Sequence, residues 1–252
     1  MLVLSLFPGL GLLDRAFEEE GFCVVRGPDL LWGGDVRRFR PPAGRFDGVI
    51  GGPPCQAFSR LRHLNPHAGE KQGDLIPEFE RVVLQAAPRW FLMENVTAAP
   101  EPRCPGWVVK SVVLNNRWLG EEQDRTRRFS FGTEGGLPLL PDVAVFESPR
   151  YAQCVTRSMT LVPVKIGGSG KVKRTRLESG AYKGPAEGPR VEIGRMLELQ
   201  GLPRDYLDGT PFTAEGKRLM LGNGVPLPMG RAVARAVLRA LAAVRPQRGA
   251  HG

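Results

Sequence analysis

The sequence has few cysteines and no long apolar run. Its four cysteines, Cys23, Cys55, Cys104 and Cys154, are scattered over 252 residues and lack the spacing of zinc ligands or of a disulfide scaffold. We therefore expect free thiols and no bound metal. No apolar run is long enough to cross a bilayer, and the first residues are typical of a strand rather than of a signal peptide. A cytoplasmic protein without membrane contact is expected.

Acidic residues are outnumbered by basic ones. The chain has 35 Lys and Arg against 26 Asp and Glu, which leaves a net charge of +9. Between residues 150 and 190, nine Lys and Arg stand against two Glu, so this segment holds most of the surplus. An excess of positive charge favours an anionic partner, and we interpret it as an indication of nucleic acid.

A cysteine on a stiff turn is the clearest candidate for chemistry. The apolar run 46–50 is typical of a buried strand, and two glycines and two prolines follow it before Cys55. Ligands of open α/β sheets bind at the carboxyl ends of strands, and proline stiffens the turn there. Cys55 is therefore a candidate nucleophile. A half-buried structural cysteine in a proline-rich loop is the alternative.

The first part of the chain has the pattern of a nucleotide-binding fold. Residues 2–7 predict a strand, a glycine turn follows, and residues 12–20 predict a helix. A second strand is expected at 22–25, and Asp29 lies just past its end, where such folds bind ribose hydroxyls. Asp35 is a second carboxylate at the same edge. An ordinary tight turn and surface carboxylates are the alternatives.

A second acidic residue ends another predicted strand. After a basic loop at 59–73 and an amphipathic helix at 75–87, the apolar run 89–93 leads directly into Glu94. Burial of an unpaired carboxylate is costly, so a Glu in this position can act as an acid. A Glu that is only hydrogen-bonded to a neighbouring turn is the alternative. The basic loop is suited to closing over a phosphate backbone.

Two arginines alternate further along the chain. If the stretch is a strand, Arg125 and Arg127 share a face, from which they would bind an anion or polarise a carbonyl. A solvated basic edge strand is the alternative. One or two short elements are expected before it, in residues 106–118.

The segment from 137 to 190 differs from the rest. It is rich in Pro, Gly and Ser and has little helical periodicity, which predicts a small β-rich insert that faces nucleic acid, with a disordered basic loop as the alternative. The chain beyond it predicts helices at 192–200, 213–220 and 227–244, with a turn at 221–226.

Together these motifs resemble the cytosine-C5 DNA methyltransferase family, in the family's order and from the first strand to the last helix. The similar stretches are Leu6–Gly11, Gly51–Ser59, Glu94-Asn95-Val96, the Gln-x-Arg-x-Arg run at Gln123, Glu198–Pro203 and Gly222–Val225. The chain departs from the family at Ser5, where the first motif usually has Asp, and at Asp29, where Glu is usual.

The resemblance implies an α/β fold, a Rossmann-like S-adenosylmethionine methyltransferase sheet flanked by helices, with a small β-rich or irregular target-recognition insert. Residues 1–136 and 191–252 would form the catalytic, cofactor-binding domain, to which the C-terminal helix returns. Residues 137–190 would form the basic target-recognition region.

The resemblance also implies which residues bind. S-adenosylmethionine would be the cofactor, bound by Phe7, Gly9, Leu10, Gly11, Asp29, Leu30, Asp35, Val36, Pro54, Leu75, Asn223 and Val225. Double-stranded DNA would be the partner of a monomer, associated with the nucleoid and contacted by Gln56, Ser59, Arg60, Gln123, Lys171, Lys173, Arg174 and Arg176.

The implied reaction is methyl transfer to C5 of a flipped-out cytosine in a short DNA sequence. Cys55 would add to C6, Glu94 would stabilise charge on the ring, and Arg125 and Arg127 would hold the base and the backbone beside it. Three alternatives stay open: an RNA cytosine methyltransferase acting on tRNA, a catalytically silent DNA-binding homologue, and an unrelated basic nucleotide-binding protein.

Overall fold

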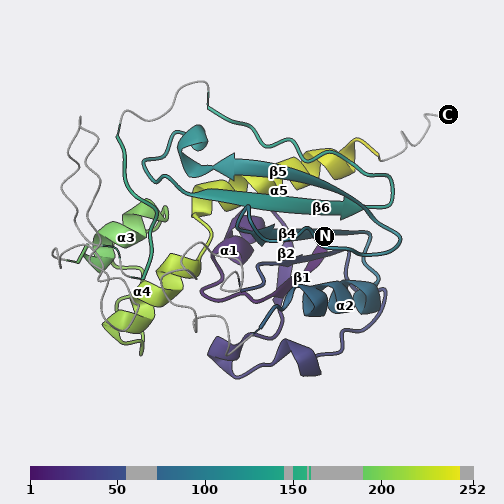
Figure 1. The fold of residues 1–252 in the computed structure, drawn as a ribbon, viewed down its shortest axis with the longest axis horizontal. Coiled ribbons are helices and arrows are strands. Elements are labelled where there is room, and N and C mark those ends of the chain that lie inside the picture. Colours follow the sequence, from purple (N-terminus) through teal and green to yellow (C-terminus); the bar gives the residue numbers. More distant parts are fainter. Residues whose placement is uncertain (55–72, 145–149, 158, 160–189, 245–252) are drawn as a thin grey trace, which may run out of the picture.

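A mixed β-sheet lies between two layers of helices in the computed structural model, which describes residues 1–54, 73–144, 150–157, 159 and 190–244 (Figure 1). Helices α1 (Leu12–Glu19) and α5 (Leu227–Ala242) pack on one face of the sheet, and α2 (Ile76–Ala86) packs on the other. The shorter helices α3 (Ile193–Leu199) and α4 (Ala214–Asn223) lie together at one end. The predicted α/β class is confirmed.

The sheet has six strands in the order β2-β1-β3-β4-β6-β5. Strands β1 to β4 are mutually parallel, whereas β6 pairs antiparallel with both β4 and β5. The bounds are β1 Leu2–Leu6, β2 Cys23–Arg26, β3 Gly48–Gly51, β4 Trp90–Asn95, β5 Val108–Asn115 and β6 Thr126–Thr133. The carboxyl ends of the parallel strands meet at one edge, which is where ligands of such sheets bind.

Successive side chains of the central strands point to opposite faces of the sheet, and so form two separate hydrophobic cores. Val3, Ile50 and Leu92 face α1 and α5, whereas their neighbours Leu4 and Val49 face α2. Successive side chains of a strand point to opposite faces, so strands covered on both faces are apolar throughout. This explains why the central strands appear as unbroken apolar runs in the sequence.

One predicted boundary is wrong, because helix α4 continues to Asn223, through part of the turn predicted at 221–226. Residues 106–118, where one or two short elements were expected, form β5, which pairs along its whole length with β6, and the 3-10 turn η6 (Asn116–Leu119). Between β2 and β3 the chain forms only the 3-10 turns η1 (Leu30–Trp32) and η2 (Val36–Arg38), and no α-helix crosses over there.

The recognition region predicted at 137–190 is described only in part. An isolated bridge pairs Gln123 with Ala152. The amide of Val191 donates to the carbonyl of Met159 at 3.2 Å, so the two flanks of residues 160–190 are held side by side. Its β-rich character stays a prediction, because residues 160–189 lie outside the described part.

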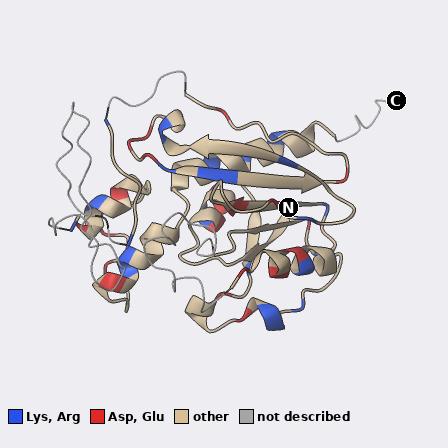
Figure 2. Ribbon diagram, viewed as in Figure 1, with Lys and Arg blue, Asp and Glu red and all other residues tan. Residues whose placement is uncertain are grey.

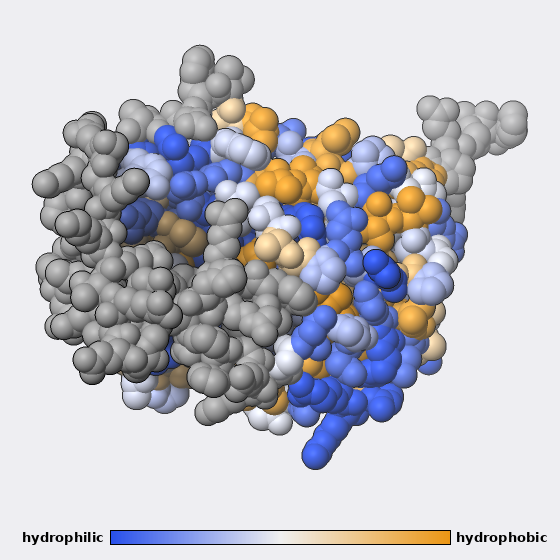
Figure 3. Space-filling model, in the orientation of Figure 1, coloured by the Kyte–Doolittle hydropathy of each residue, from blue (hydrophilic) through white to orange (hydrophobic). Residues whose placement is uncertain are grey.

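Charged side chains cover the outside of the helical layers. Arg231 and Arg235 of α5 pair with Glu19 and Glu20 at the end of α1. The lower edge of the molecule, where η2 and α2 lie in Figure 1, is strongly hydrophilic (Figure 3). Within the described ranges, no helix has the length and apolar character needed to cross a membrane.

Gly132 leaves room for an aromatic ring of the neighbouring strand. A Cβ atom on Gly132 of β6 would lie 2.1 Å from the ring of Phe91, whereas one on Gly135, in the following turn, would meet no atom within 4 Å. We therefore expect Gly132→Ala to lower the free energy of unfolding by about 1–3 kcal/mol through overpacking, and Gly135→Ala to leave it nearly unchanged. Urea unfolding of both variants measures this, and equal effects would contradict the packing described.

Candidate functional site

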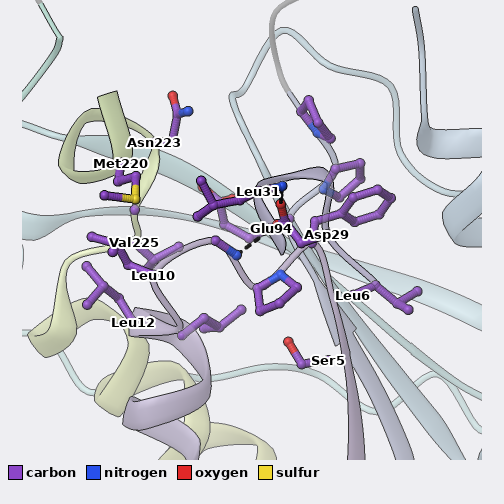
Figure 4. Close-up of a pocket in the computed structure, with 18 of the residues that line it drawn as sticks. Ser5, Leu6, Leu10, Leu12, Asp29, Leu31, Glu94, Met220, Asn223 and Val225 are labelled. Carbon is purple, nitrogen blue, oxygen red and sulfur yellow. Dashed lines mark hydrogen bonds between the residues drawn. The ribbon is translucent and has the colours of Figure 1, made fainter. Parts of the chain in front are cut away.

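A cavity of about 400 Å3 opens at the carboxyl ends of β1, β3 and β4 (Figure 4). Met220, Asn223 and Val225 lie on one side of it and Leu6 on the other. Ten of the twelve residues predicted to bind the cofactor line it: Phe7, Gly9, Leu10, Asp29, Leu30, Val36, Pro54, Leu75, Asn223 and Val225. Segments remote in sequence therefore converge on one space, as the motifs predicted.

The turn after β1 is held in an unusual conformation. Phe7 has a φ of 56°, in the left-handed region that residues other than glycine rarely adopt, and Gly9 has the same φ. The amide of Gly11 donates to the carbonyl of Pro8 at 2.7 Å and closes the turn before α1 begins. Backbone strain of this kind persists where the surrounding structure imposes it, and such positions are common at ligand sites.

Asp29 joins two walls of the cavity. Its Oδ2 accepts a hydrogen bond from the amide of Gly9 at 2.9 Å, and its Oδ1 accepts one from Leu31 at 2.7 Å. The carboxylate thus ties the turn after β1 to η1, and one lone pair on each oxygen stays available for a ligand. The predicted ribose contact of Asp29 stays a prediction.

Two residues predicted to bind the cofactor lie outside the cavity lining. Gly11 is the N-cap of α1, and the guanidinium of Arg26 covers its Cα, where a Cβ atom would be 2.9 Å from a guanidinium nitrogen. Asp35 caps η2 by accepting from the amide of Arg37 at 3.0 Å. Gly11 and Asp35 thus cap a helix and a 3-10 turn next to the cavity, and in this conformation neither lies in its wall.

The cavity also contains a carboxylate that the sequence analysis missed. Asp14 of α1 lines it and is 1% exposed, and its Oδ1 accepts from the hydroxyl of Ser5 at 2.5 Å. Burial is the main cause that raises the pKa of Asp14, against the hydrogen bond from Ser5 and the charge of Arg26. An Asp in the first turn of a helix is ordinarily a surface residue that favours the helix dipole, so its sequence position gave no signal.

An ion pair lies at the end of β4, beside the proline turn. The Nε of Arg127 lies 2.8 Å from Oε1 of Glu94, and their side chains are only 13% and 9% exposed. On the ribbon, basic residues of β6 lie next to an acidic position at the end of β4 (Figure 2). A Cβ atom on Gly52 would stand 2.9 Å from Oε2 of Glu94, so the glycine lets the carboxylate approach the turn. The buried carboxylate is thereby compensated.

Asn95 fixes that turn directly. Its side-chain amide donates to the carbonyl of Pro53 at 3.2 Å, and its Oδ1 accepts from the amide of Val96 at 2.8 Å. Arg128 contacts the carbonyls of Thr97 and Ala99 and holds the next loop. The segment that leads to Cys55 is therefore positioned by the end of β4.

Arg125 occupies a different place from Arg127. Strand β6 begins only at Thr126, so the expectation that both arginines lie on one face of a strand is wrong. Arg125 is fully buried and donates to the carbonyls of Val155 and Gly222, each at 3.1 Å. Burial is the main cause that lowers its pKa, followed by the charge of Arg127. In this conformation its guanidinium joins chain segments and does not line the cavity.

Gln123 is also an internal residue. Its side chain is fully buried, its Nε2 donates to the carbonyl of Leu199 at 2.5 Å, and its Oε1 accepts from the amide of Val155 at 3.2 Å. Both ends of the amide are occupied by backbone, so this conformation presents no part of Gln123 to DNA.

The other predicted contacts lie outside the described residues. These are Cys55, Gln56, Ser59, Arg60, Lys171, Lys173, Arg174 and Arg176. The described chain ends at Pro54 before this gap, and Pro54 lines the cavity together with Glu94.

The three described cysteines carry no disulfide. Burial, with a smaller effect of Glu80, raises the pKa of Cys104 to about 12, so this thiol stays protonated and unreactive near neutral pH. Across the described ranges, no three His, Cys, Asp or Glu side chains are grouped in a way that could hold a metal ion.

Comparison with known proteins supplies the family. The model for "C-5 cytosine-specific DNA methylase" matches residues 33–160. Type II methyltransferase M.HindV of Haemophilus influenzae is 32% identical over an alignment of 301 positions, which covers 94% of this chain and 96% of that protein. The chain belongs to the C-5 cytosine-specific DNA methylase family.

Other relatives match over shorter regions. Type II methyltransferase M.NgoPII of Neisseria gonorrhoeae is 29% identical over 170 residues, 55% of this chain, and M.FnuDI of Fusobacterium nucleatum is 30% identical over 181 residues, 59% of this chain. The chain spans about half the length of these two relatives, 50% in each case.

Solved structures show the same fold at low sequence identity. DNMT2 of Spodoptera frugiperda, solved as a mutant, has a TM-score of 0.61 and 14% identity, and covers 94% of this chain and 99% of its own. The methyltransferase EhMeth of Entamoeba histolytica has a TM-score of 0.59 and 12% identity, and covers 96% of this chain and 98% of its own. The six-stranded sheet with its flanking helices is thus a Rossmann-like methyltransferase fold.

The pair of Glu94 and Arg127 can be tested through stability. Either Arg127→Ala or Glu94→Gln alone should lower the free energy of unfolding, because the first leaves a mostly buried carboxylate unpaired and the second removes the charge that compensates a mostly buried guanidinium. The double variant should lose less than the sum of the two, with a coupling energy of about 1–3 kcal/mol in urea unfolding at pH 7. Strictly additive losses would contradict a direct interaction in solution.

Proposed function

We propose that this chain is a DNA (cytosine-5-)-methyltransferase that uses S-adenosylmethionine and acts through a covalent bond between Cys55 and the target base. Its main support is that one cavity is lined by the glycine turn after β1, by the Glu94–Arg127 pair and by Pro54, the residue before Cys55. A cofactor bound there would lie beside the acid and the start of the catalytic turn. Membership of the family supports the same reaction.

The cavity fits the proposed cofactor in size and chemistry. Its volume of about 400 Å3 is in the range of small-molecule sites, and its lining combines apolar side chains with few polar groups. Phe7, Gly9 and Leu10 would hold the cofactor from the turn after β1, Asp29 and Leu30 from η1, and Asn223 from α4. S-adenosylmethionine supplies an electrophilic methyl group when it is bound.

The protein's own groups would prepare cytosine for methylation. C5 of cytosine is a poor nucleophile, and addition of the Cys55 thiolate to C6 makes C5 electron-rich. Glu94 would hydrogen-bond to N3 and the exocyclic amine and stabilise charge that develops on the ring. Arg127, which is ion-paired to Glu94, would orient that carboxyl group and contact the base carbonyl. C5 would then take the methyl group, with S-adenosylhomocysteine as the leaving product, and loss of the C5 proton and of Cys55 would restore the ring.

Arg125 and Gln123 support this chemistry from a distance. Their buried contacts to Gly222 and Leu199 hold the C-terminal helices against the strand that carries Arg127. We therefore propose that in this conformation Arg125 has a positioning role in place of the direct base contact that the resemblance implies.

The proposed substrate is duplex DNA with the target base flipped out of the helix, because the reacting atoms are inaccessible within a base stack. The surplus of Lys and Arg between 150 and 190 supports backbone contacts in that region. A soluble enzyme in the cytoplasm, active as a monomer, is part of the same proposal.

Replacement of Cys55 tests the mechanism. Cys55→Ala should abolish methyl transfer because it removes the thiolate that adds to C6, whereas affinity for DNA should persist. Cys23→Ala, which removes an exposed thiol of β2, is the matched control and should keep full activity. Tritium transfer and electrophoretic mobility shift measure the two properties. A covalent complex of the wild type with DNA that carries 5-fluorocytosine is also expected, and its absence would refute the proposed adduct.

The choice of nucleic acid needs a direct comparison. Tritiated methyl transfer to duplex DNA and to tRNA should be detected with DNA only. Transfer to tRNA alone would favour the RNA enzyme, and no transfer to either with intact DNA binding would favour a silent homologue. Bisulfite sequencing of DNA from cells that express the protein would then identify the recognised sequence.

The acid can be tested separately from the nucleophile. Glu94→Gln preserves the shape of the side chain but removes its proton-donating capacity, so we expect methyl transfer to slow by roughly 100- to 10,000-fold. Glu101→Gln, an exposed residue in the loop after β4, is the control and should change little. Single-turnover rates measure both variants, and a rate for Glu94→Gln close to wild type would exclude the proposed role.

A further inference from the structure

Among the described residues, three carboxylates line the cavity, and the negative charge of each is balanced by different partners. Glu94 pairs with Arg127, and Asp29 accepts hydrogen bonds from two backbone amides. Asp14 is the third, and the proposed reaction gives it no role. The only basic residue among the described lining is Arg127, so the cavity has an acidic lining suited to a ligand that carries positive charge.

Asp14 is oriented by neighbours from two strands. Ser5 of β1 donates its hydroxyl to Oδ1 at 2.5 Å, and Arg26 at the end of β2 lies 3.1 Å from Oδ2 through its Nε. Ser5 and Arg26 are paired residues of adjacent parallel strands, so the sheet itself sets this geometry. Each carboxylate oxygen accepts one of these bonds and keeps a lone pair for another donor.

Arg26 balances the negative charge of Asp14 only in part. The Arg26 side chain is 55% exposed, whereas that of Asp14 is 1% exposed, so solvent screens the attraction while burial acts on the carboxylate in full. Burial accordingly raises the pKa of Asp14 despite the ion pair. A cation that entered the cavity would stabilise the ionised form without desolvating any further protein group.

We infer that Asp14, oriented by Ser5 and Arg26, binds the ammonium group of the amino-acid part of the cofactor; this inference rests on the proposed use of S-adenosylmethionine. That molecule carries two cationic groups. Its sulfonium, which carries the methyl group to be transferred, must face the target base on the side of Glu94 and Pro54. The ammonium group is the other cation, and we assign it to Asp14. Its three N–H donors can reach the free lone pairs of the Asp14 carboxylate.

A purely structural role for Asp14 is the competing explanation. In that case Asp14 would only hold α1 against the ends of β1 and β2, and its loss would weaken every ligand of the cavity alike. A contact with the ammonium differs, because it strengthens only ligands that possess an amino group. Two ligands that differ in that group alone therefore separate the explanations.

Calorimetric titration of the full chain with S-adenosylhomocysteine and with its analogue that lacks the amino group provides the test. Wild type should bind the amino compound roughly 10- to 100-fold more tightly, as expected for a hydrogen bond between charged groups. Asp14→Asn keeps the shape of the side chain and should bring this ratio down to within a few fold of 1, entirely through weaker binding of the amino compound. Glu101→Gln removes an exposed charge from the loop after β4 and should preserve the ratio.

Ser5→Ala leaves the carboxylate in place but removes the hydroxyl that orients it, so it should lower the same ratio by a smaller factor and gives an independent measurement if Asp14→Asn folds poorly. An unchanged ratio in both variants, or equal losses for both ligands, would overturn the role of Asp14 and leave the proposed function intact. Failure of wild type to bind either ligand would overturn the proposed function and the inference with it.

Discussion

Strand β4 is buried at all six of its positions, and both halves of the sheet are built on it. It pairs parallel with β3 on one side and antiparallel with β6 on the other. A strand covered on both faces must be apolar, except where its end reaches a cavity in which polar groups find partners. Glu94 and Asn95 form that end, and they meet Arg127 and the carbonyl of Pro53. The register of one strand thus places an acid, a guanidinium and the proline turn at a single point.

Buried polar side chains attach the C-terminal part of the chain to this sheet. Gln123, Arg125 and Gln200 are almost completely inaccessible. Their partners are backbone carbonyls at Leu199, Gly222 and Leu221. An unpaired buried carbonyl or amide costs about 1–3 kcal/mol, so these contacts specify how the short helices dock as well as stabilising them. Since α4 supplies one wall of the cavity, the site is complete only when these contacts form.

The walls of the cavity come from segments that are far apart in the sequence, and their polar groups are matched to one another. The turn after β1 is strained at Phe7, and the carboxylate of Asp29 braces it from η1. The negative charge of Glu94, at the end of β4, is balanced by Arg127 of β6, which belongs to the other half of the sheet. Compensation within the protein leaves the cavity polar at a few points and apolar elsewhere, a combination typical of a specific small-molecule site.

The sequence alone determined the class of fold and most of the elements, because buried strands and amphipathic helices leave clear patterns of apolar residues. Through its resemblance to the family it also indicated ten of the residues that line the cavity. It did not separate Arg125 from Arg127, although one is an internal clamp and the other the partner of Glu94. It did not reveal Asp14, whose burial depends on two other strands. Only the tertiary structure decided these points, because the partners of a buried charge are chosen by packing between distant segments, and that packing leaves no local pattern in the sequence.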